Sequence, residues 1–299
     1  MNLMKWKRTL PLHLMVLPSL AIVLVYAYGP MIGVAIAFQK YYPTLGIMKS
    51  KWIGFDNFVY VMNLPNIWRV LWNTLYISIM KIIAGQFVPI VVALLLNEIR
   101  KAVFKRTVQT LIYLPYFISW VILGGIMIDI LSPSSGVVNQ LIAFLGLKPV
   151  FFLGDNNWFP YVLVVSDVWK EFGFSTIVYL AALTSISPAL YEAAVVDGAS
   201  RTRQTWHITL PGMLPVIILL ATLALGQVLN AGFDQVFNLY STIVYQSGDI
   251  LDTFVYRIGL ISFQFGVATA VGLFKSFVSL ILIAVSYILA YRLANYRIF

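Results

Sequence analysis

The sequence predicts an all-α membrane protein with six transmembrane helices. Of its 299 residues, 61% are apolar and only 10% are Asp, Glu, Lys or Arg, whereas soluble domains contain about 45–50% apolar and about 25% charged residues. A water-soluble enzyme and a disordered chain are therefore excluded. Six apolar runs reach the roughly 20 residues that cross a bilayer, and they lack the alternation of barrel strands. These runs cover residues 12–38, 71–96, 107–130, 159–183, 212–230 and 264–291, in one domain over residues 1–299.

The first run, 12–38, follows the basic residues Lys5, Lys7 and Arg8, as a signal peptide would. It is too long for a signal peptide, and no small-residue cleavage site follows it. We therefore expect a retained span with a cytoplasmic N-terminus, which places both termini of a six-span chain in the cytoplasm. The inner segments then hold eleven Lys and Arg residues and the outer segments six, as the positive-inside rule requires.

The outer segments, 39–70, 131–158 and 231–263, contain tryptophan and tyrosine. These residues favour the headgroup level of a bilayer, so we expect short interfacial helices rather than a separate domain. The net charge of +9 follows from the inner Lys and Arg residues and does not indicate a nucleic-acid partner. The chain has no cysteine, and His13 and His207 lack the spacing of metal ligands.

The inner segment between spans four and five, residues 185–215, is the most distinctive part of the chain. Ser187 suits the N-cap of a short helix, with Pro188 as its first residue. Gly198 suits the left-handed position that ends this helix. Ser200 is expected to cap a second helix running toward Ile208, and Pro211 marks the entry to span five. A short helix on the cytoplasmic face is well suited to insertion into a partner's groove.

The stretch EAAVVDGASRTRQTWHITLP, residues 192–211, resembles the EAA loop of permeases in type I ATP-binding-cassette importers. Many members of that family carry Phe where this chain has Thr205, and we expect the neighbouring Trp206 to supply the aromatic contact. The resemblance implies the type I importer permease fold and a coupling loop over residues 185–211. It assigns contact with the ATPase to Glu192, Ala193, Ala194, Asp197, Gly198 and Ala199.

Further stretches resemble the carbohydrate and polysaccharide subgroup of these permeases. They are WIGFDNF at 52–58, AGFDQVFNLY at 231–240 and DTFVYRIGL at 252–260. The resemblance implies import of oligosaccharides or polysaccharide fragments across a bacterial or archaeal cytoplasmic membrane. The alternatives are a permease for another small solute, such as an amino acid or polyamine, and a membrane scaffold without transport.

The chain has no G-x-x-x-x-G-K-[ST] phosphate loop and no nucleophile–base arrangement. We therefore expect that it is not an enzyme and binds no cofactor, and that ATP and Mg²⁺ bind to separate ATPase subunits. By resemblance, its partners are two ATP-binding subunits, a second permease that is a paralogue, an extracytoplasmic sugar-binding protein and the lipid bilayer.

Charged residues inside three spans need a reason, because each costs about 2.5–3.5 kcal/mol on insertion. Span two carries Lys81, span six carries Lys275, and span four carries Asp167, Lys170 and Glu171, which gives three positive and two negative charges near mid-depth. One interpretation is a set of interhelical ion pairs, for example Glu171 with Lys275. The other is a wet pathway whose charges contact sugar, with the extra positive charge favouring uronate-containing oligosaccharides.

Overall fold

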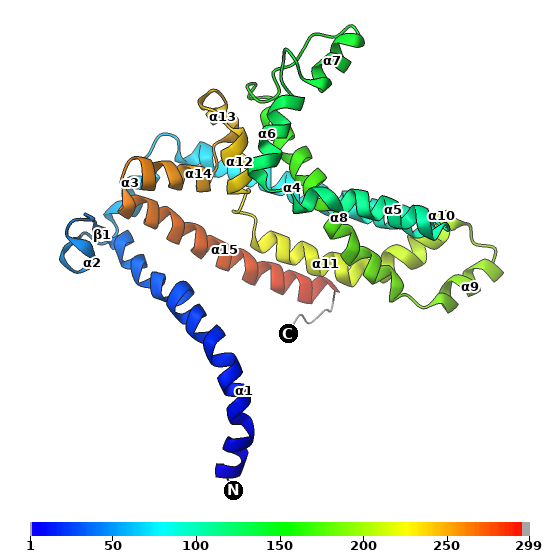
Figure 1. Cartoon of the computed structure of the whole chain (residues 1–299), viewed down its shortest axis with the longest axis horizontal. Coiled ribbons are helices and arrows are strands. Elements are labelled where there is room, and N and C mark those ends of the chain that lie inside the picture. The colour runs from blue at the N-terminus through cyan, green and yellow to red at the C-terminus, as the bar shows by residue number, and fades with distance from the viewer. Residues whose placement is uncertain (1, 295–299) are drawn as a thin grey trace. The chain divides into compact units, whose positions relative to one another are not determined.

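Helices make up nearly all of the regular structure in the computed structural model, which describes the backbone of residues 2–294 and the side chains of residues 9–288 (Figure 1). The side chains of Lys5, Lys7 and Arg8, which bear on the predicted orientation, lie outside the described residues. Contacts divide the chain into two compact units. One comprises Met1–Ile67 and Val255–Phe274, and the other Trp68–Phe254 and Lys275–Phe299.

The first unit begins with a long helical run whose described side chains are mostly exposed. The run comprises α1 (Asn2–Val23), the π-helix η1 (Leu24–Tyr28) and the 3-10 helix η2 (Gly29–Phe38). A short antiparallel hairpin follows. The remaining elements of the first unit are β1 (Gln39–Lys40), α2 (Gly46–Lys49), β2 (Lys51–Trp52), α3 (Asp56–Met62), the π-helix η6 (Arg257–Ile261) and the first turns of α15 (Phe265–Ala294).

The second unit contains most of the long helices. Its elements are α4 (Ile67–Glu98), α5 (Ala102–Tyr113), η3 (Leu114–Phe117), α6 (Trp120–Ile130), α7 (Val137–Phe144), α8 (Phe159–Thr184), α9 (Pro188–Val196), α10 (Arg201–Gln204), η4 (Thr205–Thr209), α11 (Leu210–Gly226), α12 (Phe233–Leu239), η5 (Thr242–Val244), α13 (Tyr245–Gly248), α14 (Leu251–Tyr256) and the rest of α15. One of its cores packs α8 and α11 around the fully buried Tyr179 and Met213.

Four helical runs in the described chain are long and apolar enough to cross a membrane: Thr9–Phe38, Ile67–Glu98, Arg201–Gly226 and Phe265–Ile288. The number rises to six when each of two bent helix pairs is counted as one span. One pair, bent by 68°, joins α8 to α9. On its own, α8 has 26 residues, about 39 Å at the helical rise, and it carries the three charges predicted for span four.

Predicted span three, 107–130, is not one helix. It consists of α5 with η3 and then α6, which are bent by 104° at the break. Pro115 has no N–H to donate and lies in the first turn of η3, and the helical conformation ends at Ile118 (φ −82°, ψ 132°). Ser119 then accepts a hydrogen bond from the Ile122 N–H as the N-cap of α6. Pro115 and Ser119 are both visible in the sequence, but the continuous apolar run 107–130 suggests a single helix.

The predicted outer segment 231–263 does form short helices, but residues 231–250 lie in the core of the second unit. Ala231, Val236, Val244 and Ile250 are fully buried and form a cluster with Phe159 of α8. Its polar backbone is also satisfied: the Asn73 side chain of α4 donates to the carbonyls of Gln246 and Asp249. The expected short helices are therefore present, and this part of the segment also contributes buried side chains to the core of the unit.

Candidate functional site

The inner segment that the sequence singled out begins with α9. Ser187 is at the N-cap position in an extended conformation (φ −61°, ψ 126°), and Pro188 is the first helical residue, as predicted, but the Ser187 hydroxyl makes no capping hydrogen bond. A proline costs little there because the first helical N–H has no partner within the helix. No residue of α9 is buried, so the whole helix is open to contact.

The end of α9 is closed by a Schellman motif centred on Gly198. The Gly198 N–H donates to the Val195 carbonyl at 3.0 Å, and the Ala199 N–H donates to the Ala194 carbonyl at 2.8 Å. Gly198 has φ +74°, the left-handed conformation that this motif requires. A Cβ atom at Gly198 would meet nothing within 4 Å. The glycine is therefore needed for its backbone conformation and not for space.

The second predicted helix does not end near Ile208. Ser200 caps it, as predicted, by accepting from the Arg203 N–H. The helix then continues through the π-helix η4 into α11, so that Arg201–Gly226 is one helical run. Pro211 lies in the first turn of α11. Trp206 is exposed on η4, available for the aromatic contact expected of it.

Two hydrogen bonds tie α9 and its closing turn to this helical run. The Tyr191 hydroxyl of α9 lies 3.0 Å from the Thr209 hydroxyl, and the buried Gln204 side chain donates to the Ala199 carbonyl at 2.9 Å. An exposed ion pair also joins Arg201 to Glu98 at 3.6 Å, but such pairs contribute little. These bonds join α9 to the helical run that contains α11.

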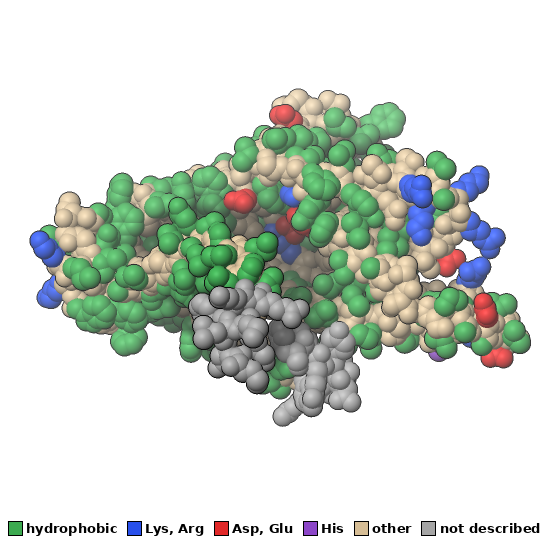
Figure 2. Space-filling view, turned by 60° about the horizontal axis from the view of Figure 1, so that its bottom comes forward, with side chains coloured by type: hydrophobic (Ala, Val, Ile, Leu, Met, Phe, Trp, Pro, Cys, Tyr) green, Lys and Arg blue, Asp and Glu red, His purple; other side chains and the backbone are tan. Residues whose placement is uncertain are grey.

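The exposed surface of α9 includes apolar side chains, of which Val196 is 87% exposed. Behind the helix, a cavity of about 740 Å³ separates Tyr191 and Val195 from Leu94 and Leu95 of α4. Both acidic and basic side chains gather at the end of the second unit that carries α9 and α10 (Figure 2). Exposed apolar residues with a charged surround are typical of a protein contact.

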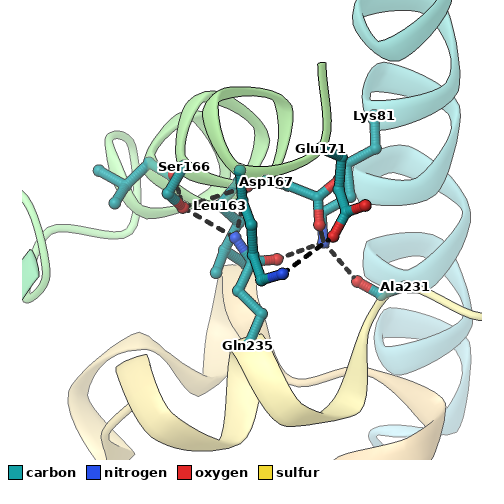
Figure 3. A network of polar contacts seen from close by, with 9 residues as sticks. Lys81, Leu163, Ser166, Asp167, Glu171, Ala231 and Gln235 are labelled. Carbon is teal, nitrogen blue, oxygen red and sulfur yellow. Dashed lines mark hydrogen bonds and ion pairs between the residues drawn. The ribbon is translucent and has the colours of Figure 1, made fainter. Parts of the chain in front are cut away.

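The charged residues of the spans form separate clusters. The Lys81 ammonium of α4 lies 3.1 Å from the Asp167 carboxylate of α8, donates to the Ala231 carbonyl at 2.7 Å and also donates to the Gln235 side chain. Gln235 in turn donates to the Ser166 hydroxyl at 2.8 Å and to a backbone carbonyl of α8. This Lys81 network joins α4, α8 and α12 (Figure 3).

Lys170 holds the break between α5 and α6. Its ammonium donates to the Tyr116 carbonyl at 2.8 Å, lies 3.3 Å from the Glu171 carboxylate and stands 5.1 Å from the centre of the Tyr116 ring. Three residues further along α8, a Cβ atom on Gly173 would collide with the Ile112 carbonyl. The cation and the glycine together bring α8 against the free carbonyls at the end of α5.

Lys275 pairs with Asp252 at 2.5 Å. The example pair predicted from the sequence, Glu171 with Lys275, is therefore wrong, because Glu171 lies beside Lys170. The predicted excess of positive charge also disappears. Three lysines now face three carboxylates, and each lysine has one carboxylate within 4 Å. The reason given for a preference for uronates is lost with that excess.

Two residues of these clusters escaped the sequence analysis, Gln235 and Asp252. Both lie in a segment interpreted as outer, and Gln235 is separated from Lys81 by 154 positions. Gln235 is fully buried, but burial cannot be read from the local sequence, so no local signal identified either residue.

Beside the Lys81 network lies a cavity of about 290 Å³. Its lining is mainly polar or glycine, and the Ser78 hydroxyl in it is buried with no hydrogen-bond partner among the described residues. The polar lining comprises Ser78, Lys81, Gln86, Asp167, Ser175, Gln227 and Asn230. Such a cavity can accept groups that carry hydroxyls.

Known proteins share this architecture. A family model described as a binding-protein-dependent transport system inner membrane component matches residues 85–296. The chain is 45% identical over 284 residues to the polygalacturonan/rhamnogalacturonan transport system permease protein YteP of Bacillus subtilis (strain 168), covering 95% of this chain and 87% of that protein.

Solved structures give the same result. The chain matches a crystal structure of a bacterial ABC transporter involved in the import of the acidic polysaccharide alginate, with 40% identity, a TM-score of 0.89 and coverage of 97% of this chain and 98% of that chain. It also matches the alginate transporter in complex with alginate pentasaccharide-bound periplasmic protein, with 39% identity, a TM-score of 0.90 and 98% of both chains.

Proposed function

The chain belongs to the family of binding-protein-dependent transport system inner membrane components, and from this premise we propose that it is the permease subunit of an ATP-driven importer of oligosaccharides or polysaccharide fragments. The substrate class is supported by the relatives, which are named for polygalacturonan, rhamnogalacturonan and alginate. Import of an amino acid or polyamine is the alternative, and none of these names favours it.

The observation that carries the coupling mechanism is α9. It is short and has no buried residue, its end is fixed by the Schellman motif at Gly198, and it is bonded to the helical run that contains α11. An isolated helix of this length is marginal, so it needs a partner's groove to be held. We assign that groove to the ATPase, with Glu192, Ala193, Ala194, Asp197, Gly198 and Ala199 in contact.

In the proposed cycle, two ATPase subunits carry the ATP and Mg²⁺, and this chain binds no cofactor. Their closure pushes α9, and the push reaches α11 through Tyr191 and Thr209. A rigid-body movement then switches the pathway between outward-open and inward-open states. A paralogous permease completes the pathway, and an extracytoplasmic binding protein delivers the sugar from outside.

The cavity beside Lys81 is our candidate for part of the pathway. The amide side chains of Gln86, Gln227 and Asn230 line this cavity and supply groups for sugar hydroxyls. Asp167 and the rest of the Lys81 network serve mainly to hold three helices together. The Lys81 ammonium already donates to three acceptors within the chain. Lys170 and Lys275 have the same structural role.

The test is Gly198→Val in the complete importer, reconstituted with its ATPases, partner permease and binding protein. A β-branched residue is strained at φ +74° by about 1–2 kcal/mol or more, so α9 loses its closing turn. We expect sugar-stimulated ATP hydrolysis and uptake to fall at least tenfold. Gly198→Asn, which tolerates the left-handed conformation, is the matched control and is expected to keep most of both.

Full sugar-dependent coupling and normal assembly in Gly198→Val would contradict the role of α9. The substrate class is tested in the wild-type importer by loading the binding protein with oligosaccharides, amino acids or polyamines in turn. Stimulation by amino acids or polyamines alone would overturn the carbohydrate assignment, and no stimulation by any solute would favour a scaffold.

A further inference from the structure

The hairpin of the first unit places two lysines directly opposite each other. Strands β1 and β2 pair antiparallel with Lys40 opposite Lys51 and Gln39 opposite Trp52. Residues opposite one another in such a pair share a face of the ribbon. One face of the hairpin therefore carries both lysines, and the other carries Gln39 and Trp52.

The Gln39 face anchors the hairpin. Gln39 is buried and its side-chain amide donates to the Ile47 carbonyl at 3.0 Å. The buried Asn57 of α3 donates to the Gln39 carbonyl at 3.1 Å, and the Ser50 hydroxyl donates to the Gly46 carbonyl at 2.7 Å. The ribbon is thus fixed before any partner arrives, which reduces the entropy lost on binding.

The lysine face has no internal counter-charge. Like charges opposite each other on a ribbon are destabilising, and no carboxylate among the described side chains lies within 4.0 Å of Lys40, Lys49 or Lys51. Residues 9–67 and 255–274 contain four Lys or Arg residues but a single acid, Asp56. In Figure 2, basic side chains gather at the left end, where Figure 1 places β1 and α2, and no acidic side chain is visible beside them.

We propose that this lysine face, made by Lys40 and Lys51 with Tyr42 beside Lys40, is the surface on which an acidic patch of the extracytoplasmic binding protein docks. The inference rests on the proposed importer function and on the predicted outer position of residues 39–70. The face is an open ribbon, whereas sites for small molecules are concave. The anionic surface potential of a membrane belongs mainly to its cytoplasmic leaflet, so a protein fits this outer face better than lipid does. The Tyr42 ring, 6.0 Å from the Lys40 ammonium, adds an aromatic contact typical of interfaces.

The decisive variant is Lys40→Glu. It places opposite charges across the ribbon, which favours the hairpin, so loss of the hairpin is not expected to cause a defect in binding. In the reconstituted importer, we expect the binding-protein concentration that gives half-maximal ATPase stimulation to rise about three- to tenfold, because rim charges steer association. The maximal stimulated rate should be retained. Raising the salt concentration should weaken docking of the wild type more than docking of the variant.

Two controls separate charge from other effects. Lys40→Arg/Lys51→Arg keeps the charge and should behave as the wild type, and Lys148→Glu changes an exposed lysine in another predicted outer segment and should leave the half-maximal concentration unchanged. An unchanged value in Lys40→Glu would overturn the proposal, as would an effect that varies with the anionic lipid of the nanodisc instead of with the binding protein. A wild-type importer that its binding protein fails to stimulate would instead overturn the proposed function.

Discussion

Lys81 shows what a single charge inside a span requires. Its side chain is only 9% exposed, and an unpaired ammonium at such a site is costly. Three acceptors offset this cost. One is the Asp167 carboxylate of α8, and the other two, the Ala231 carbonyl and the Gln235 side chain, belong to the segment that follows α11. The residue therefore fixes three pieces of chain at one point.

We predict that Lys81→Met destabilises the protein by about 3–5 kcal/mol, because it leaves the Asp167 carboxylate without its partner. Thermal unfolding in detergent measures this. The double variant Lys81→Met/Asp167→Asn removes both charges and should recover most of the stability.

Uptake by the double variant then separates the two interpretations of these charges. Normal uptake indicates that Lys81 and Asp167 serve packing alone. A stable double variant with lost uptake contradicts that reading and assigns the pair to the pathway.

Local motifs at single residues were predictable from the sequence, but distant contacts were not. Pro188, Gly198 and Ser200 act through neighbours within a few residues, and the structure confirms each position. The partner of Lys275 depends on which segments fold back into the core, and no local pattern encodes that. Asp252 lies in a segment predicted as an outer loop, so the sequence gives no reason to pair it with Lys275.

At the scale of elements, prolines act differently according to what surrounds them. Pro89 and Pro215 lie inside continuous helices, whereas the helix that contains Pro115 ends at Phe117 and the chain bends by 104° before Trp120. The difference is that Ser119 starts a new helix and Lys170 satisfies the Tyr116 carbonyl. The apolar run 107–130 does not predict this break, because hydropathy does not register capping.

We predict that Gly173→Ala disrupts the packing of α5 on α8, since its Cβ would collide with the Ile112 carbonyl. Overpacking of this kind costs about 1–3 kcal/mol, and a backbone carbonyl cannot move aside as a flexible side chain can. The melting temperature of the purified protein is expected to fall.

Gly125→Ala is the matched control, because Gly125 also lies in a helix and its Cβ would meet nothing within 4 Å. It should leave the melting temperature unchanged or slightly raised, as alanine favours helix over glycine. Equal melting temperatures for the two variants would contradict the close approach at Gly173.

At the scale of the whole molecule, composition was enough to predict a polytopic helical membrane protein, and the family comparison agrees. The two compact units were not predicted, because they follow from tertiary contacts. Val255–Phe274 belongs to the first unit although the residues on both sides of it belong to the second. A hydropathy profile does not show that a segment packs with a distant part of the chain.

The predicted orientation, with both termini cytoplasmic, can be tested on a chain that has no native cysteine. Phe144 and Val196 are both 87% exposed and lie in segments predicted on opposite sides. In right-side-out vesicles, a membrane-impermeant maleimide should label Phe144→Cys, and Val196→Cys only after the membrane is opened. The reverse pattern would invert the topology, and with it the position of the docking hairpin.

The pairing of Lys81, Lys170 and Lys275 with three carboxylates has an electrical consequence. A helix movement that carries balanced pairs transfers no net charge through the membrane field, which acts on each unbalanced elementary charge with about 2.3 kcal/mol per 100 mV. The voltage dependence of turnover should then come from the cargo. A neutral oligosaccharide would cross without electrical work, and each carboxylate on an acidic one would add that amount to what ATP must supply against an interior-negative potential.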